Sequence, residues 1–390
     1  MSLNKLSNPD NLDFSKILSH VEPQILSAAV INLNNVVCNY HKIEEEVQHK
    51  SEIAAVIKAN AYGFGAKQVS KKLYGEGCRK FFVATIDEAI EVREVVPNDA
   101  QIFVLSGIFS GTEEMLEKYN LIPVLNCMEQ ADFWIAHAHK LGKKLNTVIH
   151  INTGMSRNGF QDENADYDKI FNNLNVLFVM SHLACPDIFG HEMNNKQLKR
   201  FLEGTANLEK KYGHLKKCLS ATNGIFLGQD FQFDIVRPGK ALYGFAIRED
   251  KIGSMVPVMD LFARIVQVNH LYPGDTVGYG STFTADRPMT TVTIGLGYAD
   301  GFMRKFGGFG CGFFNGKRMP MVGRISMDYI VLDATGVDEN TLEMGEWVAL
   351  TNSPDDTLEK WALELNTIPH EIACGLGRRI QKVYVGEDDA

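Results

Sequence analysis

The sequence lacks the segments that would place a protein in or across a membrane. Its start holds no apolar run of signal-peptide length, and no later stretch approaches the length of a transmembrane helix. It also lacks paired cysteines, because the seven that are present are widely spaced and form no Cys-X-X-Cys motif. This spacing favours reduced thiols over disulfides or a zinc site. We therefore expect a cytoplasmic protein that holds no metal.

Clustered basic charge is absent as well. The 39 lysines and arginines are scattered along the chain, and the net charge of −9 argues against nucleic-acid binding. A hydrophobic fraction of 45% and a charged fraction of 22% are ordinary for a soluble globular protein. At 390 residues the chain is long enough for two domains. Residues 1–24 are polar and contain turn-forming pairs, so we expect a weakly ordered extension there.

Residues 25–258 alternate between strand and helix patterns. A strand candidate at Ala28 to Leu33 and a helical stretch come first, and eight apolar strand segments then alternate with segments of helical periodicity. The eight segments begin near Ile53, Phe81, Ile102, Ile122, Thr147, Val176, Cys218 and Phe233. This number of alternations predicts a (β/α)8 barrel of the TIM type. An open doubly wound sheet is the alternative, but it would leave eight units without closure.

Residues 259–390 have a different texture. Short strand segments are separated by Gly, Pro, Asn and Asp turns, which predicts a mainly-β domain. A helix over 357–365 and a strand near 382–385 are expected to complete it. The predicted fold class is therefore α/β, with an N-terminal (β/α)8 barrel over 25–258 followed by a C-terminal mainly-β domain.

The segment IAAVIKANAYGFG, from Ile53 to Gly65, carries a lysine where a buried strand gives way to a loop. Burying an ammonium is costly unless the group is paired or chemically altered. A desolvated lysine is a nucleophilic amine that can bond to an aldehyde. The ordinary alternative is that the side chain of Lys58 extends to the rim of the sheet. The following Asn60 and Tyr62, with two glycines, suit a small polar ligand held close to the backbone.

Further polar residues follow other strand segments, and the carboxyl ends of the strands of a parallel barrel meet at one face. These residues are Arg157, His182, Asn223 and Arg237. Taken singly, a rim histidine is usually a hydrogen-bonded structural residue, and an arginine usually belongs to a surface ion pair. Together with Lys58 they predict a positively charged mouth suited to a phosphate and a carboxylate.

The lysine segment resembles the pyridoxal-phosphate motif of the alanine racemases. AVIKANAYGFG matches the stretch in which, in that family, a lysine carries the cofactor and a tyrosine contacts the cofactor phosphate. The resemblance implies these roles for Lys58 and Tyr62. Phe64 departs from it, because the family usually has histidine at this position.

The resemblance continues through the other strand ends. NTGMSRNGF implies that Arg157 binds the substrate carboxylate, and MSHLACPD implies that His182 lies beside the cofactor ring. VRPGKALYG implies that Arg237 faces the pyridine nitrogen, with Gly239 and Lys240 near the phosphate. A guanidinium cannot accept a proton, so the ring nitrogen would stay unprotonated. Such a ring is a weaker electron sink, which disfavours side reactions such as transamination.

The β domain carries the remaining motifs. VGYGSTF implies that Tyr279 is the second catalytic base, although a lone tyrosine in a β domain is usually a half-buried sheet residue. Free tyrosine is a poor base at neutral pH, and the family tunes it through a hydrogen-bond chain, here implied to run through His182 and Arg237. GYADG and RISMD resemble the loops of the substrate entrance, which implies substrate contacts from Tyr298, Met327 and Asp328.

One departure lies beside the substrate arginine. His150 stands where many relatives carry a lysine, carbamylated in some, and Asn152 replaces an aspartate. The resemblance therefore does not carry over a carbamate that orients Arg157 in this chain. Either His150 or a bound anion is left for that role.

Two more departures concern the phosphate. Gly224, next to Asn223 in the predicted cofactor site, stands where a phosphate-binding serine is common, so only its backbone N–H could donate. Arg378, in GLGRR, stands where some relatives have a phosphate-contacting tyrosine, and its charge is expected to compensate in part.

The resemblance implies a pyridoxal 5'-phosphate enzyme that interconverts L- and D-alanine by a two-base mechanism and supplies D-alanine for peptidoglycan. Lys58 and Tyr279 would act on opposite faces of the substrate, within a homodimer whose active sites are shared. A decarboxylase of basic amino acids and a non-catalytic pyridoxal-phosphate carrier are the alternatives. The sequence leaves open whether serine is a minor substrate.

Overall fold

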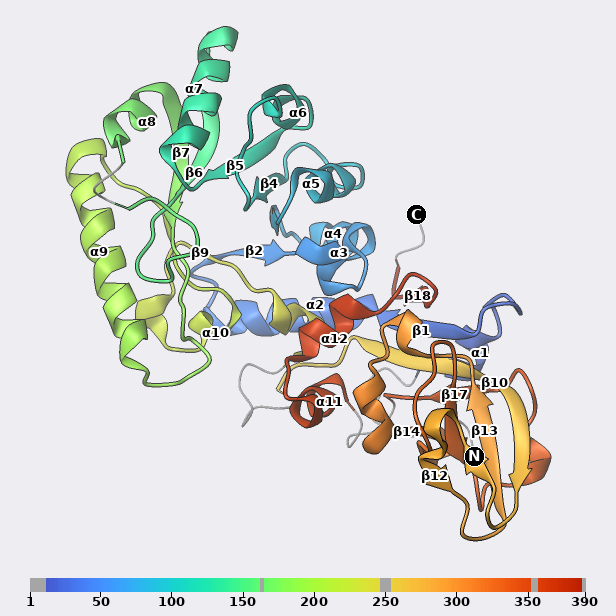
Figure 1. Ribbon diagram of the computed structural model, residues 1–390. Helices are drawn as coiled ribbons and strands as arrows, with labels where there is room; N and C mark the ends of the chain where they lie inside the picture. The colour runs from blue at the N-terminus through green and yellow to red at the C-terminus, as the bar shows by residue number, and fades with distance from the viewer. Residues whose placement is uncertain (1–11, 162–164, 246–253, 352–356, 388–390) are drawn as a thin grey trace. The chain divides into compact units, whose positions relative to one another are not determined.

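The computed structural model describes residues 12–161, 165–245, 254–351 and 357–387. The chain divides into two compact units (Figure 1). One unit contains residues 34–257, and the other combines residues 1–33 with residues 258–387. No helix in the described ranges is both long and apolar enough to cross a membrane.

The first unit is a parallel eight-stranded sheet in the order β8-β7-β6-β5-β4-β3-β2-β9. Its strands are β2 (Glu52–Val56), β3 (Lys80–Val83), β4 (Gln101–Val104), β5 (Leu121–Leu125), β6 (Leu145–His150), β7 (Leu174–Met180), β8 (Lys217–Cys218) and β9 (Ile235–Val236). A parallel bridge between Ala221 and Arg237, just after β8 and β9, closes the ring. The predicted (β/α)8 barrel is confirmed, and the open-sheet alternative is wrong because the two edge strands meet.

Helices follow the strands and surround them, as the blue-to-yellow part of Figure 1 shows. They are α2 (Leu33–Glu46), α4 (Ala66–Gly75), α5 (Ile86–Arg93), α6 (Glu113–Lys118), α7 (Met128–Leu141), α8 (Tyr167–Asn173) and α9 (Glu192–Tyr212). Shorter turns are α3 (Lys58–Tyr62), α10 (Thr222–Ile225), η3 (Gln229–Phe231) and η4 (Lys240–Tyr243). Aromatic side chains fill the barrel, where the ring of Phe103 lies 4.8 Å from Phe82 and 5.1 Å from Phe178. This filling makes the barrel a packed core, so chemistry is confined to its rim.

The second unit is the expected mainly-β domain, built on the long strand β10. Its strands are β1 (Ser27–Asn32), β10 (Met259–Leu271), β11 (Thr276–Val277), β12 (Phe283–Thr284), β13 (Met289–Ile294), β14 (Cys311–Phe314), β15 (Lys317–Pro320), β16 (Ile330–Asp333), β17 (Trp347–Ala349) and β18 (Gln381–Val385). Its helices and turns are α1 (Phe14–Leu18), η6 (Tyr279–Ser281), η7 (Tyr298–Asp300), η8 (Arg304–Gly308), η9 (Glu339–Thr341), α11 (Leu358–Leu365) and α12 (Pro369–Gly375). β10 pairs antiparallel with β1, β13 and β17, so it joins both halves of the sheet.

The start of the chain differs from the prediction. The strand expected at 28–33, grouped with the barrel, is β1, which pairs with β10 and β18 in the β domain. The extension over 1–24 is not weakly ordered where the structure describes it, since Phe14 and Leu18 of α1 are 1% and 0% exposed in the core of the β domain. Local periodicity identifies a strand but not its partners, which is why the assignment failed. Residues 1–11 lie outside the described residues.

Candidate active site

The lysine turn has an unusual backbone. Lys58 begins α3 directly after β2, and the residues from Ala59 to Tyr62 all have φ between 52° and 56°, which is a left-handed helical turn. Such a conformation costs roughly 1–2 kcal/mol per non-glycine residue, so other contacts must hold it. The N–H of Ala59 donates to the carboxylate of Glu88 at 2.7 Å, and the side-chain oxygen of Asn60 accepts from the N–H of Ala66 at 2.8 Å. The turn therefore fixes the lysine at the carboxyl end of its strand, in a conformation that the fold maintains against local preference.

Tyr62 leaves this turn and reaches the backbone after β9. Its ring lies 4.8 Å from that of Tyr243, whose other face stacks on Phe64 at 5.2 Å. A Cβ added at Gly239 would lie 2.4 Å from the hydroxyl oxygen of Tyr62. Gly239 is therefore glycine because the phenol occupies the place of a side chain. The departure at Phe64 has a packing role in this aromatic stack.

Arg237 is a buried charge in the barrel mouth. It is 4% exposed and donates to the carbonyl oxygens of Ser181 and, at 3.1 Å, of Leu219. Its guanidinium lies 5.6 Å above the ring of Phe82. The Nε atom is buried and has no hydrogen-bond partner in the described part of the chain. A buried N–H of this kind calls for an acceptor.

His182 follows β7 and is kept neutral by its surroundings. Its pKa lies well below the ordinary value, first because of burial and then because of the charges of Arg237, Arg157 and Lys58, with a contribution from His150. Coulombic interactions weaken with distance, so the charged groups that lower this pKa lie near His182. The structure thus brings together Lys58, Arg157, His182 and Arg237, as the strand ends predicted.

His150 is a second neutral histidine in this mouth. Burial, followed by the charges of two nearby arginines, lowers its pKa to about 3. Its Nδ1 lies 2.9 Å from the side-chain oxygen of Asn126, whose amide nitrogen donates to the carbonyls of Val124 and Leu105 at 2.9 and 3.2 Å. The amide oxygen must therefore accept, so Nδ1 of His150 carries the proton and Nε2 is left as an acceptor. Asn126 was not among the residues predicted from the sequence, although an asparagine directly after a barrel strand was a usable signal.

The loop that carries Arg157 folds back on β6. The side-chain oxygen of Asn152 accepts from the N–H groups of Gly154 and Ser156 at 3.0 and 3.1 Å, and the N–H of Phe160 donates to the carbonyl of His150 at 2.7 Å. An aspartate could accept the same two bonds, so the Asn152 departure preserves the loop. Arg157 itself is exposed.

The predicted phosphate residues gather around a carboxylate. The amide nitrogen of Asn223 donates to Asp187, and Nζ of Lys240 lies 3.5 Å from the same oxygen. A Cβ added at Gly224 would lie 2.6 Å from Oγ of Ser220, which donates to the carbonyl of Phe231 at 2.7 Å. Ser220 therefore takes the space that a serine at 224 would need. These donors can bind an anion.

In the β domain, the predicted residues lie on adjoining loops. A Cβ at Gly280 would lie 3.0 Å from the guanidinium of Arg324, which places the Tyr279 turn beside the RISMD loop. The side chains of Tyr279, Tyr298 and Met327 are exposed, by 69%, 43% and 52%.

Asp328 has a different environment from the one the sequence suggested. Its carboxylate binds the guanidinium of Arg379 at 2.8 Å, and Arg379 also binds Asp300 at 2.7 Å. Arg379 was not among the predicted site residues, which included only Arg378 of the GLGRR pair. Arg378 is exposed in this unit, and its phosphate role stays a prediction.

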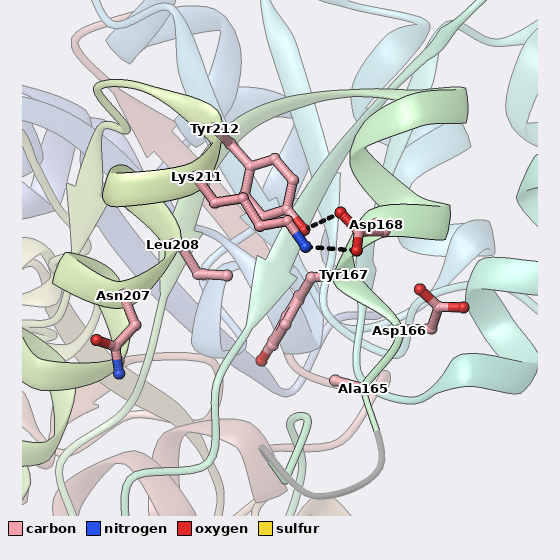
Figure 2. A pocket seen from close by; sticks show the side chains of 9 residues that line it. Ala165, Asp166, Tyr167, Asp168, Asn207, Leu208, Lys211 and Tyr212 are labelled. Atoms are coloured by element: carbon pink, nitrogen blue, oxygen red, sulfur yellow. Dashed lines mark hydrogen bonds and ion pairs between the residues drawn. The ribbon is translucent and has the colours of Figure 1, made fainter.

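A separate pocket lies between α8 and α9 (Figure 2). Its volume is about 360 Å³. Asp168 binds Lys211 at 2.5 Å and Tyr212 at 2.8 Å, and Asp166 accepts from the N–H of Lys169 at 2.9 Å at the start of α8. None of the predicted site residues lines it.

Comparison with known families agrees with this geometry. The family description "Alanine racemase, N-terminal domain" matches residues 31–246, and "Alanine racemase, C-terminal domain" matches residues 258–384. The chain belongs to the alanine racemase family.

Racemases of several bacteria resemble it along most of their length. The alanine racemase of Brucella abortus is 40% identical over 366 residues, covering 89% of this chain and 90% of that protein. The catabolic alanine racemase of Agrobacterium fabrum is 41% identical over 339 residues, covering 86% of each. A crystal structure of the Bartonella henselae alanine racemase with covalently bound pyridoxal phosphate has a TM-score of 0.85 and 37% identity, covering 92% of this chain and 99% of that one.

The contact between Gly239 and Tyr62 predicts a coupled pair of substitutions. Gly239→Ala would place a methyl group against the phenol oxygen and should destabilise the barrel by about 1–3 kcal/mol. In a Tyr62→Phe background the phenol oxygen is absent, so the same substitution should lower the free energy of unfolding much less. Chemical denaturation of the four proteins measures this coupling. Gly75→Ala, at a glycine of α4 with nothing within 4 Å, is the matched control. An equal loss in both backgrounds would show that the phenol is not what excludes a side chain at 239.

Proposed function

We propose that this protein is an alanine racemase that interconverts L- and D-alanine with pyridoxal 5'-phosphate and supplies D-alanine for peptidoglycan. The observation that carries the proposal is the position of Lys58, at a strand end in the mouth that also holds His182 and Arg237. Membership of the family over both domains supports it. A single-barrel carrier would lack the second domain, and the relatives described above are racemases rather than decarboxylases.

The residues present fit the cofactor. The buried Nε–H of Arg237 lacks an acceptor within the described ranges, which suits an unprotonated pyridine nitrogen. The donors around Asp187 already accommodate one anionic group, which suits a phosphate. In this proposal Lys58 would bind the aldehyde carbon of the cofactor, and Arg237 would face its ring nitrogen. The phosphate would be held by Tyr62, Asn223, Gly224, Gly239, Lys240 and Arg378.

Two bases on opposite faces are the simplest way to invert a carbon centre. When bound, pyridoxal phosphate supplies an electron sink that makes the α-proton of the amino acid acidic. The amine of Lys58 removes or returns that proton on one face, and the phenol of Tyr279 does so on the other. Because His182 is neutral, one of its ring nitrogens can accept a hydrogen bond from the guanidinium of Arg237 while the other donates one to the Tyr279 oxygen.

Arg157 binds the substrate carboxylate in this proposal, and its orientation depends on His150. The protonated Nδ1 of His150 is held by Asn126, which leaves Nε2 as a neutral acceptor for a guanidinium. With this acceptor present, no bound anion is needed to orient Arg157. It replaces the lysine that many relatives have at this position.

We also propose a two-fold homodimer with shared active sites. Lys58 and Tyr279 belong to different units, and Tyr279 is 69% exposed, so a second chain can cover it. Tyr298, Met327 and Asp328 would then face the substrate from the same unit as Tyr279. We place the enzyme in the cytoplasm because all seven cysteines are free, which suits a reducing compartment.

Racemisation should be measured directly with Lys58 as the test residue. Purified protein supplied with the cofactor should convert L-alanine to an equal mixture of enantiomers by chiral chromatography. Borohydride reduction should then label Lys58, as peptide mapping would show. Lys58→Ala should lose both properties, whereas Lys67→Ala, at an exposed lysine of α4 paired with Glu94, should keep both. Loss of carbon dioxide from lysine or arginine would instead identify a decarboxylase, and a label on another lysine would refute the assignment.

Mixed dimers test whether the site is shared. Lys58→Ala and Tyr279→Phe should each be nearly inactive, because each lacks one of the two bases. After random co-refolding, half of the dimers are mixed, and one of the two sites in each carries neither defect if the site is shared, so about a quarter of all sites should recover. Native mass analysis confirms that mixed dimers have formed. If they form and no activity returns, the two bases come from one chain.

A further inference from the structure

Three segments of the β domain are joined by backbone contacts around η7. The N–H of Tyr298 donates to the carbonyl of Ser326 at 3.1 Å, and the N–H of Ala299 donates to that of Met327 at 3.0 Å. A Cβ at Gly297 would lie 2.3 Å from the Met327 carbonyl oxygen, so the GYADG and RISMD loops touch along their backbones. These loops carry two of the proposed entrance residues, Tyr298 and Met327.

The third segment, residues 375–379, adds the charge that links the two loops. The N–H of Gly377 donates to the carbonyl of Asp300 at 2.8 Å. Nε of Arg379 donates to Oδ1 of Asp300 at 2.7 Å, and Nη1 donates to Oδ1 of Asp328 at 2.8 Å. The second oxygen of Asp300 accepts from the N–H of Gly297 at 2.9 Å. We call Asp300, Asp328 and Arg379 the loop triad.

The two partners of Arg379 differ in burial. The side chains of Arg379 and Asp328 are 49% and 44% exposed, and exposed pairs typically contribute below about 1 kcal/mol to stability. Asp300 is 4% exposed, so its carboxylate is a buried charge that needs its partners. One guanidinium also bridges two loops, and the fork geometry of arginine allows both bonds at once where the single ammonium of lysine would not.

The position of the triad decides what it controls. Asp300 is two residues after Tyr298, and Asp328 directly follows Met327. A shift of either loop would therefore move an entrance side chain by a similar amount. Tyr298 and Met327 are partly exposed in this unit, so their own packing restrains them weakly.

From these contacts we propose that Arg379 is a positioning residue that sets the spacing of Tyr298 and Met327 and so restricts the substrate to amino acids with a very small side chain. The inference rests on the proposed racemase function. In this inference the loop triad determines which substrates are accepted, and proton transfer is carried out by Lys58 and Tyr279. Loosening the triad should admit serine and 2-aminobutyrate more readily, at the expense of affinity for alanine.

The test compares Arg379→Ala and Arg379→Lys with Arg287→Ala. Arg287 is a matched control because it also contacts two aspartates of the β domain, Asp286 and Asp333, both at 3.1 Å. For each protein, kcat and KM are measured with alanine, serine and 2-aminobutyrate, and cofactor loading is measured as the borohydride label on Lys58.

The expected result is a change in selectivity. Arg379→Ala should raise KM for alanine and reduce the preference for alanine over 2-aminobutyrate by about tenfold, a typical value for one methylene in a pocket. Arg379→Lys should give an intermediate change, because lysine keeps the positive charge but loses one of the two hydrogen bonds to the aspartates. Cofactor loading should not change, and Arg287→Ala should match the wild type.

Two outcomes would overturn the inference. An equal loss with all three substrates would mean that Arg379 serves the fold or the chemistry, and an unchanged preference would mean that the loops hold their spacing without it. If Arg379→Ala does not fold, Arg379→Lys, which keeps the charge but cannot make both hydrogen bonds, should still shift the preference in the same direction. Racemisation by the wild-type protein is measured before the variants are compared. If the wild-type protein racemises none of the substrates, the proposed function is refuted, and this failure is separate from a failure of the role proposed for Arg379.

Discussion

The barrel mouth is organised by one buried positive charge. The guanidinium of Arg237 sits at the end of β9 and donates to carbonyl oxygens that follow β7 and β8, so it joins three neighbouring strand ends. Removing a charge from water is costly, and these bonds offset only part of the cost. What remains is a permanent charge with one unused N–H, which contributes to the lowered pKa values of His182 and His150.

The histidines show the consequence of burial and of that charge. Burial and the nearby guanidinium groups lower the pKa values of His182 and His150, so neither is a cation at neutral pH. Each can therefore accept a hydrogen bond, which a protonated imidazole cannot do. The mouth gains its positive charge from lysine and arginine alone, while its histidines transmit hydrogen bonds. This division suits a site that must bind two anionic groups and still move protons.

Much of this arrangement could be predicted from the sequence. The eight strands of the barrel follow from apolar segments at regular spacing, and Lys58, Arg157, His182 and Arg237 follow because parallel strand ends meet. The left-handed turn after Lys58 could not be predicted, because Ala59 and Tyr62 have no local preference for positive φ and are held by contacts such as that of Glu88.

Other features depend on contacts between distant segments. The strand β1 was recognisable, but its partners β10 and β18 lie more than 200 residues away along the chain. Similarly, Gly224 is explained only by the position of Ser220, and the sequence cannot show which arginine of GLGRR meets Asp300. Local patterns specify elements, whereas the partners of a side chain depend on the folded structure.

The protonation state of His182 tests the account most directly. With 15N-labelled histidine and the His182→Gln variant for assignment, the imidazole resonances of the cofactor-loaded protein can be followed from about pH 5 to pH 8, the range in which an unperturbed histidine titrates. The account predicts that His182 titrates below the ordinary range of a histidine, and that Arg237→Gln raises its pKa. A His182 that titrates near the ordinary value in the unsubstituted protein would contradict the claim that the buried Arg237 charge sets the chemistry of the mouth.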